Sequence, residues 1–237
     1  LVRAQRIACI SQATRADVER VLAVPAARLA VVPNGPNHPY RPFTAAEVAS
    51  VLAGLSGAPA PGVPYLFHVG SNAWYKNRAG VIRIAGALVA RGAVAGLRLV
   101  FAGQRLDGGL RALVGECGLA GRVDELGEVG NDQLNALYSG ALGLLFPSLA
   151  EGFGWPIVEA QAAGCVVFLS ARPPLTEVGG EAAVHLDPCD PPAAAAAIAA
   201  SLERVAELRR LGLANAARFS TAAMLDGYER LYREVQP

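Results

Sequence analysis

Residues 141–170, ALGLLFPSLAEGFGWPIVEAQAAGCVVFLS, decide the fold. The run 141–146 is apolar and predicts a buried strand. Pro156 then opens a helix predicted over 156–163, and the apolar run 165–170 predicts a second strand. Strands without polar alternation are buried on both faces of a sheet, and a strand–helix–strand order gives parallel neighbours. This stretch therefore predicts one unit of a parallel α/β sheet.

The same alternation continues on both sides of this unit. Apolar runs predict further strands at 65–69, 97–102, 122–126 and 183–186. Helical spacing predicts helices at 78–89, 109–117 and 132–138, the last capped by Asn131. These elements make a doubly wound α/β domain, and the remaining sequence predicts C-terminal helices at 192–207, 208–219 and 221–235.

The N-terminal part, residues 1–43, predicts a separate small piece of structure. A short strand ends at Ser11, a helix follows with Ser11 or Thr14 as its cap, and a second short strand at 29–32 closes in a turn. This piece is too small to form its own core, so it must pack on something else. Residues 54–64, GLSGAPAPGVP, predict an exposed connection. The chain begins with Leu1 rather than Met, and we expect an upstream part to be missing.

Composition excludes two classes of function. The 237 residues carry 21 basic and 20 acidic side chains, a formal net charge of +1, and this balance lacks the electrostatic footprint of a nucleic-acid-binding protein. No apolar stretch reaches the roughly 20 residues of a membrane span. The cysteines have no zinc-site spacing and predict separate reduced thiols, which fits a cytoplasmic compartment; they are Cys9, Cys117, Cys165 and Cys189.

Two loops that follow strands are candidate phosphate or base contacts, because ligands bind beyond the carboxyl ends of strands in open parallel sheets. Loop 70–77, GSNAWYKN, leads into a helix N-terminus, which favours anions, and it holds Lys76, the only lysine of the chain. Gly70 permits close backbone approach. Lys76 is either a phosphate contact or a solvated lysine, and the loop matches neither phosphate-binding glycine motif. Arg105 either faces the same crevice or lies on the surface.

The loop 147–159, PSLAEGFGWPIVE, carries the strongest signal. Its glycines leave backbone N–H groups unobstructed, Glu151 lies in the loop, and Glu159 lies about one turn into the helix. Carboxylates placed there can accept hydrogen bonds from the vicinal hydroxyls of a ribose or a hexose. The alternative is a solvated loop acid and a helix residue favoured by the helix dipole, and spacing alone leaves both open.

Other chemistries are excluded. Ser148 and Ser170 lie in no nucleophile elbow, and no cluster of acids predicts a metal site. His68 falls within an apolar strand, which predicts a core histidine rather than a catalytic one.

Glu151 and Glu159, with seven residues between them, resemble the E-x7-E motif of the retaining glycosyltransferases of family 4, also called group 1. PLTEVGGEAA at 174–183 continues the resemblance, and SQATR at 11–15 and VPNG at 32–35 resemble the end of the family's first domain. The family has the GT-B fold, in which two Rossmann-like domains face a cleft.

The resemblance implies that this chain is the C-terminal half of such a fold. Residues 1–43 would be the tail of a missing N-terminal domain and 44–63 a hinge or linker. Residues 64–220 would form the Rossmann-like domain that binds a nucleotide sugar, and 221–237 the helix that crosses back to the first domain.

The resemblance also implies roles by position. Glu151 would hold the hydroxyls of the donor sugar, with the N–H groups of Phe153 and Gly154, and Glu159 would hold the ribose. Lys76 would contact the diphosphate, so that Lys76 and Glu151 are the catalytic pair, and no metal is implied. The remaining donor contacts would be Gly70 and Ser71 at the phosphates and, near the base, Arg105 and Val129.

Ser71 departs from the family pattern. Many members have an arginine there as a second diphosphate contact. The positive charge that holds the leaving diphosphate is therefore weaker here unless Arg78 or Arg105 compensates. Departure of a nucleoside diphosphate needs positive charge or aligned N–H dipoles where negative charge develops. Lys76 and a helix N-terminus supply part of it.

The implied reaction is transfer of a hexose from a UDP- or GDP-linked sugar, with retention, to a carbohydrate, lipid-linked or small-molecule acceptor. The leaving phosphate would accept the acceptor's proton, and no cofactor beyond the donor is implied. Without the N-terminal domain we expect little or no activity.

Two alternatives stay open: a nucleotide-sugar-binding module without turnover, and a GT-B epimerase, which the Glu151–Gly154 loop disfavours. The alanine and arginine bias of the chain indicates a bacterial origin. We expect a cytoplasmic protein, with any peripheral membrane attachment residing mainly in the absent domain.

Overall fold

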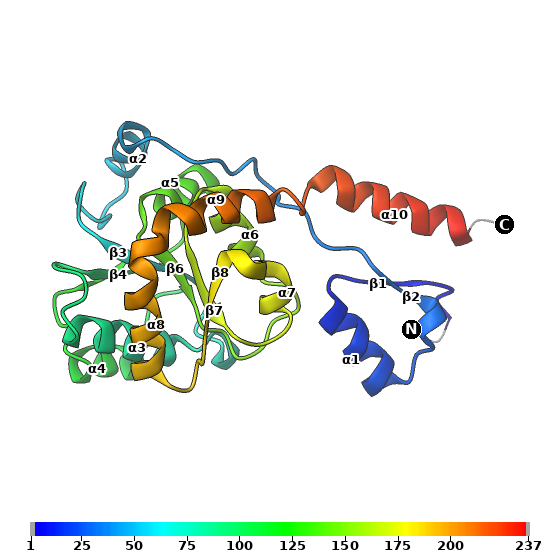
Figure 1. Ribbon diagram of the computed structural model, residues 1–237, viewed down its shortest axis with the longest axis horizontal. Coiled ribbons are helices and arrows are strands. Elements are labelled where there is room, and N and C mark those ends of the chain that lie inside the picture. The colour runs from blue at the N-terminus through cyan, green and yellow to red at the C-terminus, as the bar shows by residue number, and fades with distance from the viewer. Residues whose placement is uncertain (1–2, 236–237) are drawn as a thin grey trace.

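The computed structural model describes residues 3–235; residues 1–2 and 236–237, at the ends of the predicted first and last segments, lie outside the described residues. Its centre is a six-stranded parallel sheet of order β5-β4-β3-β6-β7-β8 (Figure 1). The parallel α/β prediction is confirmed, and each strand begins and ends within two residues of its predicted bounds. The strands are Tyr65–Gly70 (β3), Arg98–Gly103 (β4), Val123–Glu125 (β5), Gly143–Phe146 (β6), Val167–Ser170 (β7) and Ala183–Leu186 (β8).

The sheet is buried on both faces, as its apolar strands predict. In β4, Leu99 and Phe101 belong to one hydrophobic core, whereas Val100 and Ala102 belong to the other. The first core lies under α3 (Arg78–Ala90), α4 (Gly108–Glu116) and α8 (Pro191–Ser201). The second lies under α5 (Asn131–Gly140) and α6 (Trp155–Ala162), with α9 (Val205–Ala216) packed on α6.

Helix boundaries differ from the prediction at α8, at the start of α5, and at α9, which covers Val205–Ala216 in place of 208–219. The predicted helix 192–207 ends at Ser201, whose hydroxyl donates to the carbonyl of Ile198; a 3₁₀ turn, η4 (Leu202–Arg204), follows before α9 begins. A serine that bonds its own helix carbonyl competes with continuation of the helix. Helix α5 is capped by Gly130 rather than Asn131, because the Gln133 side chain accepts from the Gly130 N–H and starts the helix one residue earlier.

Two short helices escaped the prediction. Helix α2 (Ala45–Leu52) lies inside the segment 44–63 and packs against α5. A capping box starts it: the Thr44 hydroxyl accepts from the Glu47 N–H, and the Glu47 carboxylate accepts from the Thr44 N–H. Helix α7 (Leu175–Gly179), with the 3₁₀ turn η3 (Gly180–Ala182), precedes β8.

The N-terminal residues form a small lobe beside the sheet domain (Figure 1). Strands β1 (Ile7–Cys9) and β2 (Leu29–Val31) pair in parallel, and α1 (Gln12–Leu22) and the 3₁₀ turn η1 (Ala26–Arg28) connect them. Ser11 caps α1 as predicted.

Helix α10 (Thr221–Val235) leaves the sheet domain and runs to this lobe (Figure 1). A Cβ atom on Gly227 would lie 2.8 Å from Val32 Cγ1, so the helix crosses the lobe closely there. The Thr221 hydroxyl donates to the Pro36 carbonyl over 2.6 Å, and the side chains of Arg6 and Glu234 lie 3.0 Å apart. Within residues 3–235, no helix combines the length and apolar character that a membrane span requires.

Candidate active site

An ion pair joins two of the predicted site residues. The Lys76 ammonium nitrogen lies 2.7 Å from a carboxylate oxygen of Glu151, and the two side chains are only 16% and 10% exposed. Lys76 follows β3 and Glu151 follows β6, the two strands at which the strand order reverses: the chain proceeds from β3 outward to β5 and from β6 outward to β8. Open α/β sheets bind ligands beyond the carboxyl ends of the strands at such a reversal.

Backbone and amide contacts hold the two loops together. The Leu149 N–H donates to the Tyr75 carbonyl over 2.7 Å. Asn77 has the left-handed φ of 52°, caps α3 by accepting from the Gly80 N–H, and donates its amide to the Pro147 carbonyl over 3.0 Å. The relative position of Lys76 and Glu151 is therefore set by the loops and does not depend on their own flexible stems.

Gly70 ends β3 with a φ of 153° and lies against the stem of Lys76, since a Cβ atom there would be 3.5 Å from Lys76 Cδ. Its neighbour on β4 is much more crowded. A Cβ atom on Gly103 would lie 2.5 Å from the Gly70 carbonyl oxygen, which no side chain tolerates. The two glycines let the ends of β3 and β4 meet under the loop that carries Lys76.

Arg78 is a buried structural residue. Its guanidinium donates to the Asn72 side chain and to the carbonyls of Gly70, Ala102 and Gln104, and it is 3% exposed. Burial lowers the pKa of Arg78 to about 10. Because these acceptors occupy its two terminal nitrogens, Arg78 ties the ends of β3 and β4 and the loops after them together, and does not supply the charge that is missing at Ser71.

The other residues predicted to lie near the diphosphate and base differ in their contacts. The Ser71 hydroxyl accepts from the Ala73 N–H over 3.4 Å. Arg105 is exposed, and its guanidinium makes a 3.4 Å hydrogen bond to the Glu125 carbonyl. Val129 is half-buried against the core beneath α5. Arg105 is thus the one of the three with a charge open to solvent.

The loop after Glu151 presents free backbone donors. Within residues 3–235, the N–H groups of Phe153 and Gly154 take part in no hydrogen bond. Gly154 starts α6 with a φ of 96°, a left-handed value that favours glycine, and Pro156 lies in the first turn of the helix. The Phe153 ring is buried and meets Phe219 edge-on at 5.6 Å, so its side chain fixes the loop and its N–H is left for a ligand.

Glu159 is buried beneath the loop and makes different contacts from Glu151. It is 7% exposed, and the Tyr138 hydroxyl donates to its carboxylate over 2.9 Å. Burial raises the pKa of Glu159, which the Tyr138 hydrogen bond only partly opposes. The structure therefore joins Lys76 to Glu151 and places Glu159 in a separate contact with α5.

Sequence reasoning missed a set of contacts from the N-terminal lobe. The hydroxyls of Ser11 and Thr14 donate to the Gly152 carbonyl over 2.9 and 3.0 Å. The Glu177 carboxylate accepts from the N–H groups of Gln12 and Ala13 at the start of α1. Ser11 carried a capping signal, but no local pattern pairs it with a residue 141 positions away.

The His68 ring is a core residue, as predicted. It is fully buried, and its Nδ1 lies 2.9 Å from the Leu145 carbonyl, to which it donates. Burial lowers the pKa of His68 to about 3, so the ring stays neutral.

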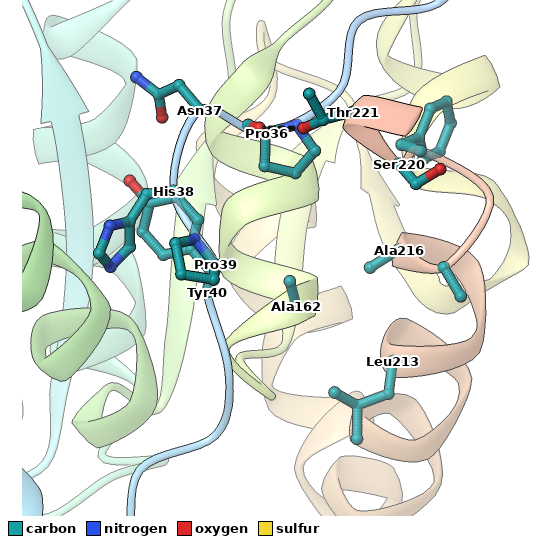
Figure 2. A pocket seen from close by; sticks show the side chains of 12 residues that line it. Pro36, Asn37, His38, Pro39, Tyr40, Ala162, Leu213, Ala216, Ser220 and Thr221 are labelled. Carbon is teal, nitrogen blue, oxygen red and sulfur yellow. Dashed lines mark hydrogen bonds between the residues drawn. The ribbon is translucent and has the colours of Figure 1, made fainter. Parts of the chain in front are cut away.

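A small hollow borders the site, where Phe153, Trp155 and Glu159 lie against residues 34–36, and two larger hollows lie elsewhere. Figure 2 shows a groove of about 590 Å³ between the segment 36–40 and α9, which includes His38 and Leu213. A cavity of about 790 Å³ lies between α2, the segment 58–65 and the residues before β6. None of the predicted site residues lines either one.

Known proteins resemble this chain in sequence. The family model described as "Glycosyl transferases group 1" matches residues 57–218. The chain is 38% identical over 120 residues to O-antigen chain mannosyltransferase B of Escherichia coli, covering 47% of this chain and 31% of that protein. It is 35% identical over 109 residues to MMP alpha-(1->4)-mannosyltransferase of Mycolicibacterium hassiacum, covering 45% of this chain and 26% of that protein. The match thus spans less than a third of either relative.

Solved structures share the fold. Sucrose-phosphate synthase from Thermosynechococcus elongatus superposes with a TM-score of 0.79 and 26% identity, covering 96% of this chain and 57% of that one. HepE from Anabaena, solved in complex with UDP-glucose, superposes with a TM-score of 0.80 and 18% identity, covering 97% of this chain and 64% of that one. The likeness covers the N-terminal lobe as well as the sheet domain.

Proposed function

Because this chain belongs to the group 1 glycosyl transferases, we propose that it is the donor-binding half of a retaining hexosyltransferase. The observation that carries the proposal is the Lys76–Glu151 ion pair at the reversal of the strand order. A cation and a carboxylate at that point match the two ends of a sugar diphosphate: the ammonium suits the diphosphate, and the carboxylate suits the sugar hydroxyls.

Lys76 and Glu151 exchange partners in this proposal. The diphosphate takes the place of the carboxylate beside the Lys76 ammonium, and the freed oxygens of Glu151 accept hydrogen bonds from two hydroxyls of the hexose. The unpaired N–H groups of Phe153 and Gly154, at the N-terminus of α6, add donors to the same ligand. Gly70 and Ser71 border the phosphates, and Glu159 faces the ribose.

The donor base lies toward Arg105 and Val129 in this proposal, and the donor is UDP- or GDP-linked. The names of the two bacterial relatives favour mannose as the hexose. Charge that develops on the leaving diphosphate is stabilised by Lys76 and by the helix N-terminus, and the same phosphate takes the proton of the acceptor hydroxyl. No side chain of this chain is assigned as a nucleophile or a general base.

An upstream domain supplies most of the acceptor site in this proposal. Two observations support this. The sequence match spans less than a third of either relative, and the core of the lobe formed by β1, α1 and β2 holds only three buried residues of the described chain, Cys9, Val24 and Leu29. The chain itself would then bind the donor with weak or no transfer. Residues 1–43 are the end of the upstream domain, 44–63 the linker, 64–220 the donor domain and 221–237 the returning helix. We place the protein in the cytoplasm.

A nucleotide-sugar-binding module without turnover is the second candidate, and Ser71 favours it because a second diphosphate cation is lacking there. Transfer assays separate the two. Labelled mannose or glucose is supplied as GDP-mannose or UDP-glucose to the full-length protein, with Glu151→Ala as the matched variant. We expect transfer that falls at least 100-fold in Glu151→Ala while the circular dichroism spectrum is kept. Unchanged transfer in that variant would refute the role of Glu151, and no transfer by the unsubstituted protein would favour the binding module.

A further inference from the structure

The two tryptophans of the chain, Trp74 and Trp155, lie on the two loops of the ion pair. Trp74 precedes Lys76 by two residues, and Trp155 follows Glu151 by four. Their exposed fractions are 74% and 38%, and Trp74 is the most exposed large apolar side chain of the described residues. An indole that is 74% exposed two residues from Lys76 leaves its apolar face open to a ligand bound at the ion pair.

Trp74 is presented by a fixed backbone. It begins the 3₁₀ turn η2 (Trp74–Lys76), in which the Lys76 N–H donates to the Ala73 carbonyl over 2.9 Å. The Asn77 N–H donates to the Trp74 carbonyl over 3.2 Å, and the Tyr75 ring lies edge-on to the indole at 5.9 Å. A ligand that stacks on this indole therefore has little loop ordering to oppose its binding.

The contacts of the neighbouring residues show which end of the site the Trp74 backbone adjoins. Asn72 bonds toward β4, since its N–H donates to Gln104 Oε1 and its side-chain amide donates to the Arg105 carbonyl. Tyr75 bonds toward β6, through its carbonyl and the Leu149 N–H. Trp74, next to Tyr75, belongs to the half of the loop that adjoins Glu151. In the proposed function that half adjoins the sugar end of the donor, where the acceptor must approach.

We propose that Trp74 binds the acceptor, by stacking its exposed indole against the C–H face of a pyranose ring. The inference rests on the proposed function and narrows its acceptor class to saccharides. The face of an indole is electron-rich and the C–H groups of a sugar ring carry partial positive charge, so the two surfaces attract as they leave water. The ring hydroxyls around the rim stay hydrated, which is why an exposed aromatic suits a sugar better than it suits an apolar ligand.

The experiment uses the small number of tryptophans. In Trp155→Phe, Trp74 is the only tryptophan, and its emission reports on its own contacts. This variant is titrated with an α-linked mannotriose in the presence of saturating nucleotide, and glycerol at equal hydroxyl concentration serves as the control. We expect a saturable shift of the emission maximum with mannotriose and none with glycerol. The mirror variant, Trp74→Phe, should show a clearly smaller shift.

Affinity provides a second readout that does not use fluorescence. In calorimetric titrations of mannotriose, Trp74→Ala should bind about five- to tenfold more weakly, and Trp74→Phe about as well as the unsubstituted chain. Tyr232→Ala removes an aromatic ring that is 64% exposed on α10, far along the chain from the ion pair, and should leave the affinity unchanged.

The outcomes separate this inference from the proposed function. If nucleotide binding depends on Lys76 but the Trp74 emission does not change with mannotriose, the acceptor role is overturned and the donor site is retained. Emission that responds to mannotriose in a chain that binds no nucleotide would support the saccharide contact and refute the donor site. Equal responses to mannotriose and glycerol would refute the stacking.

Discussion

The Lys76 ammonium and the Glu151 carboxylate lie 2.7 Å apart and join the loops after β3 and β6. Both side chains are mostly buried, so each charge neutralises the other in this structure. A diphosphate that binds Lys76 competes with Glu151 for the same cation. In the proposed function the donor would be bound by this exchange of partners, which predicts effects of opposite sign on nucleotide binding and on sugar transfer.

The substitution Glu151→Gln should separate nucleotide binding from sugar transfer. The amide removes the negative charge that competes with the diphosphate, so UDP or GDP alone should bind as tightly or up to about tenfold more tightly, measured by calorimetry. Transfer by the full-length protein should fall at least 100-fold, because an amide accepts fewer hydrogen bonds from sugar hydroxyls than a carboxylate does. Nucleotide binding that weakens in Glu151→Gln would contradict the exchange of partners.

Glu159 should make the stability of the chain fall with rising pH. Its pKa is raised by burial, so the folded chain holds the proton more tightly than the unfolded chain does. The free energy of unfolding should then decrease as the pH rises from about 4, through the ordinary pKa and up to the raised one. The loss is about 1.4 kcal/mol for each unit by which the pKa is raised.

The matched variant for this effect is Glu159→Gln, which does not titrate. Urea unfolding between pH 4 and pH 8 should show that this variant gains stability relative to the unsubstituted chain as the pH rises. Tyr138→Phe removes the hydrogen bond that lowers the pKa of Glu159, and should move the loss to higher pH. A difference between the chain and Glu159→Gln that is independent of pH would rule out the raised pKa.

Arg78 and Arg105 should differ sharply in their effect on stability. Arg78→Met removes the donor that the carbonyls of Gly70, Ala102 and Gln104 share, and should lower the free energy of unfolding by about 3 kcal/mol. Arg105→Gln alters an exposed side chain and should change it by less than about 0.5 kcal/mol. Urea unfolding measures both, and equal losses would show that Arg78 is not the tie between the loops.

The start of α1 should be held by the donor domain. Glu177→Gln weakens the acceptor for the Gln12 and Ala13 N–H groups, and Ser11→Ala removes a cap and a bond to the Gly152 carbonyl. Each should speed amide hydrogen exchange in the first turn of α1, Ser11→Ala by about fivefold or more. Asp17→Asn, further along α1, should leave that exchange unchanged. Protection that survives in both variants would mean that the lobe is held elsewhere.

Local signals were enough to predict the sheet. The strands β3, β4, β6 and β7 are mostly apolar on both faces and are separated by helical spacing, so their type and order follow from burial alone. The ends of helices were predicted less well where no stripe marks them: in the alanine-rich α8, the hydroxyl of Ser201 decides the end. Helix α2 was missed because the Thr44–Glu47 capping box is followed by a Gly- and Pro-rich stretch that dominates the local composition.

Long-range pairing is what the sequence could not predict for the site. Lys76 and Glu151 were each identified, since each follows a strand, but the 2.7 Å contact between them depends on the order of strands in the sheet. Arg78 ties the loops after β3 and β4 together because four acceptors, at the ends of these two strands and in the loops that follow them, surround its guanidinium. The contact of Ser11 with Gly152 links segments 141 positions apart and has no local pattern.

Thermal unfolding with nucleotides tests the central claim most directly. The chain is heated with UDP, GDP and ADP, each at about 100 times the expected dissociation constant, beside Lys76→Ala. One nucleotide should stabilise the chain by about 2.7 kcal/mol, a rise in Tm of roughly 5–10 °C, and the rise should vanish in Lys76→Ala. That result would establish the donor site and identify its base. A chain whose Tm responds to none of the nucleotides, or responds equally without Lys76, would contradict the account.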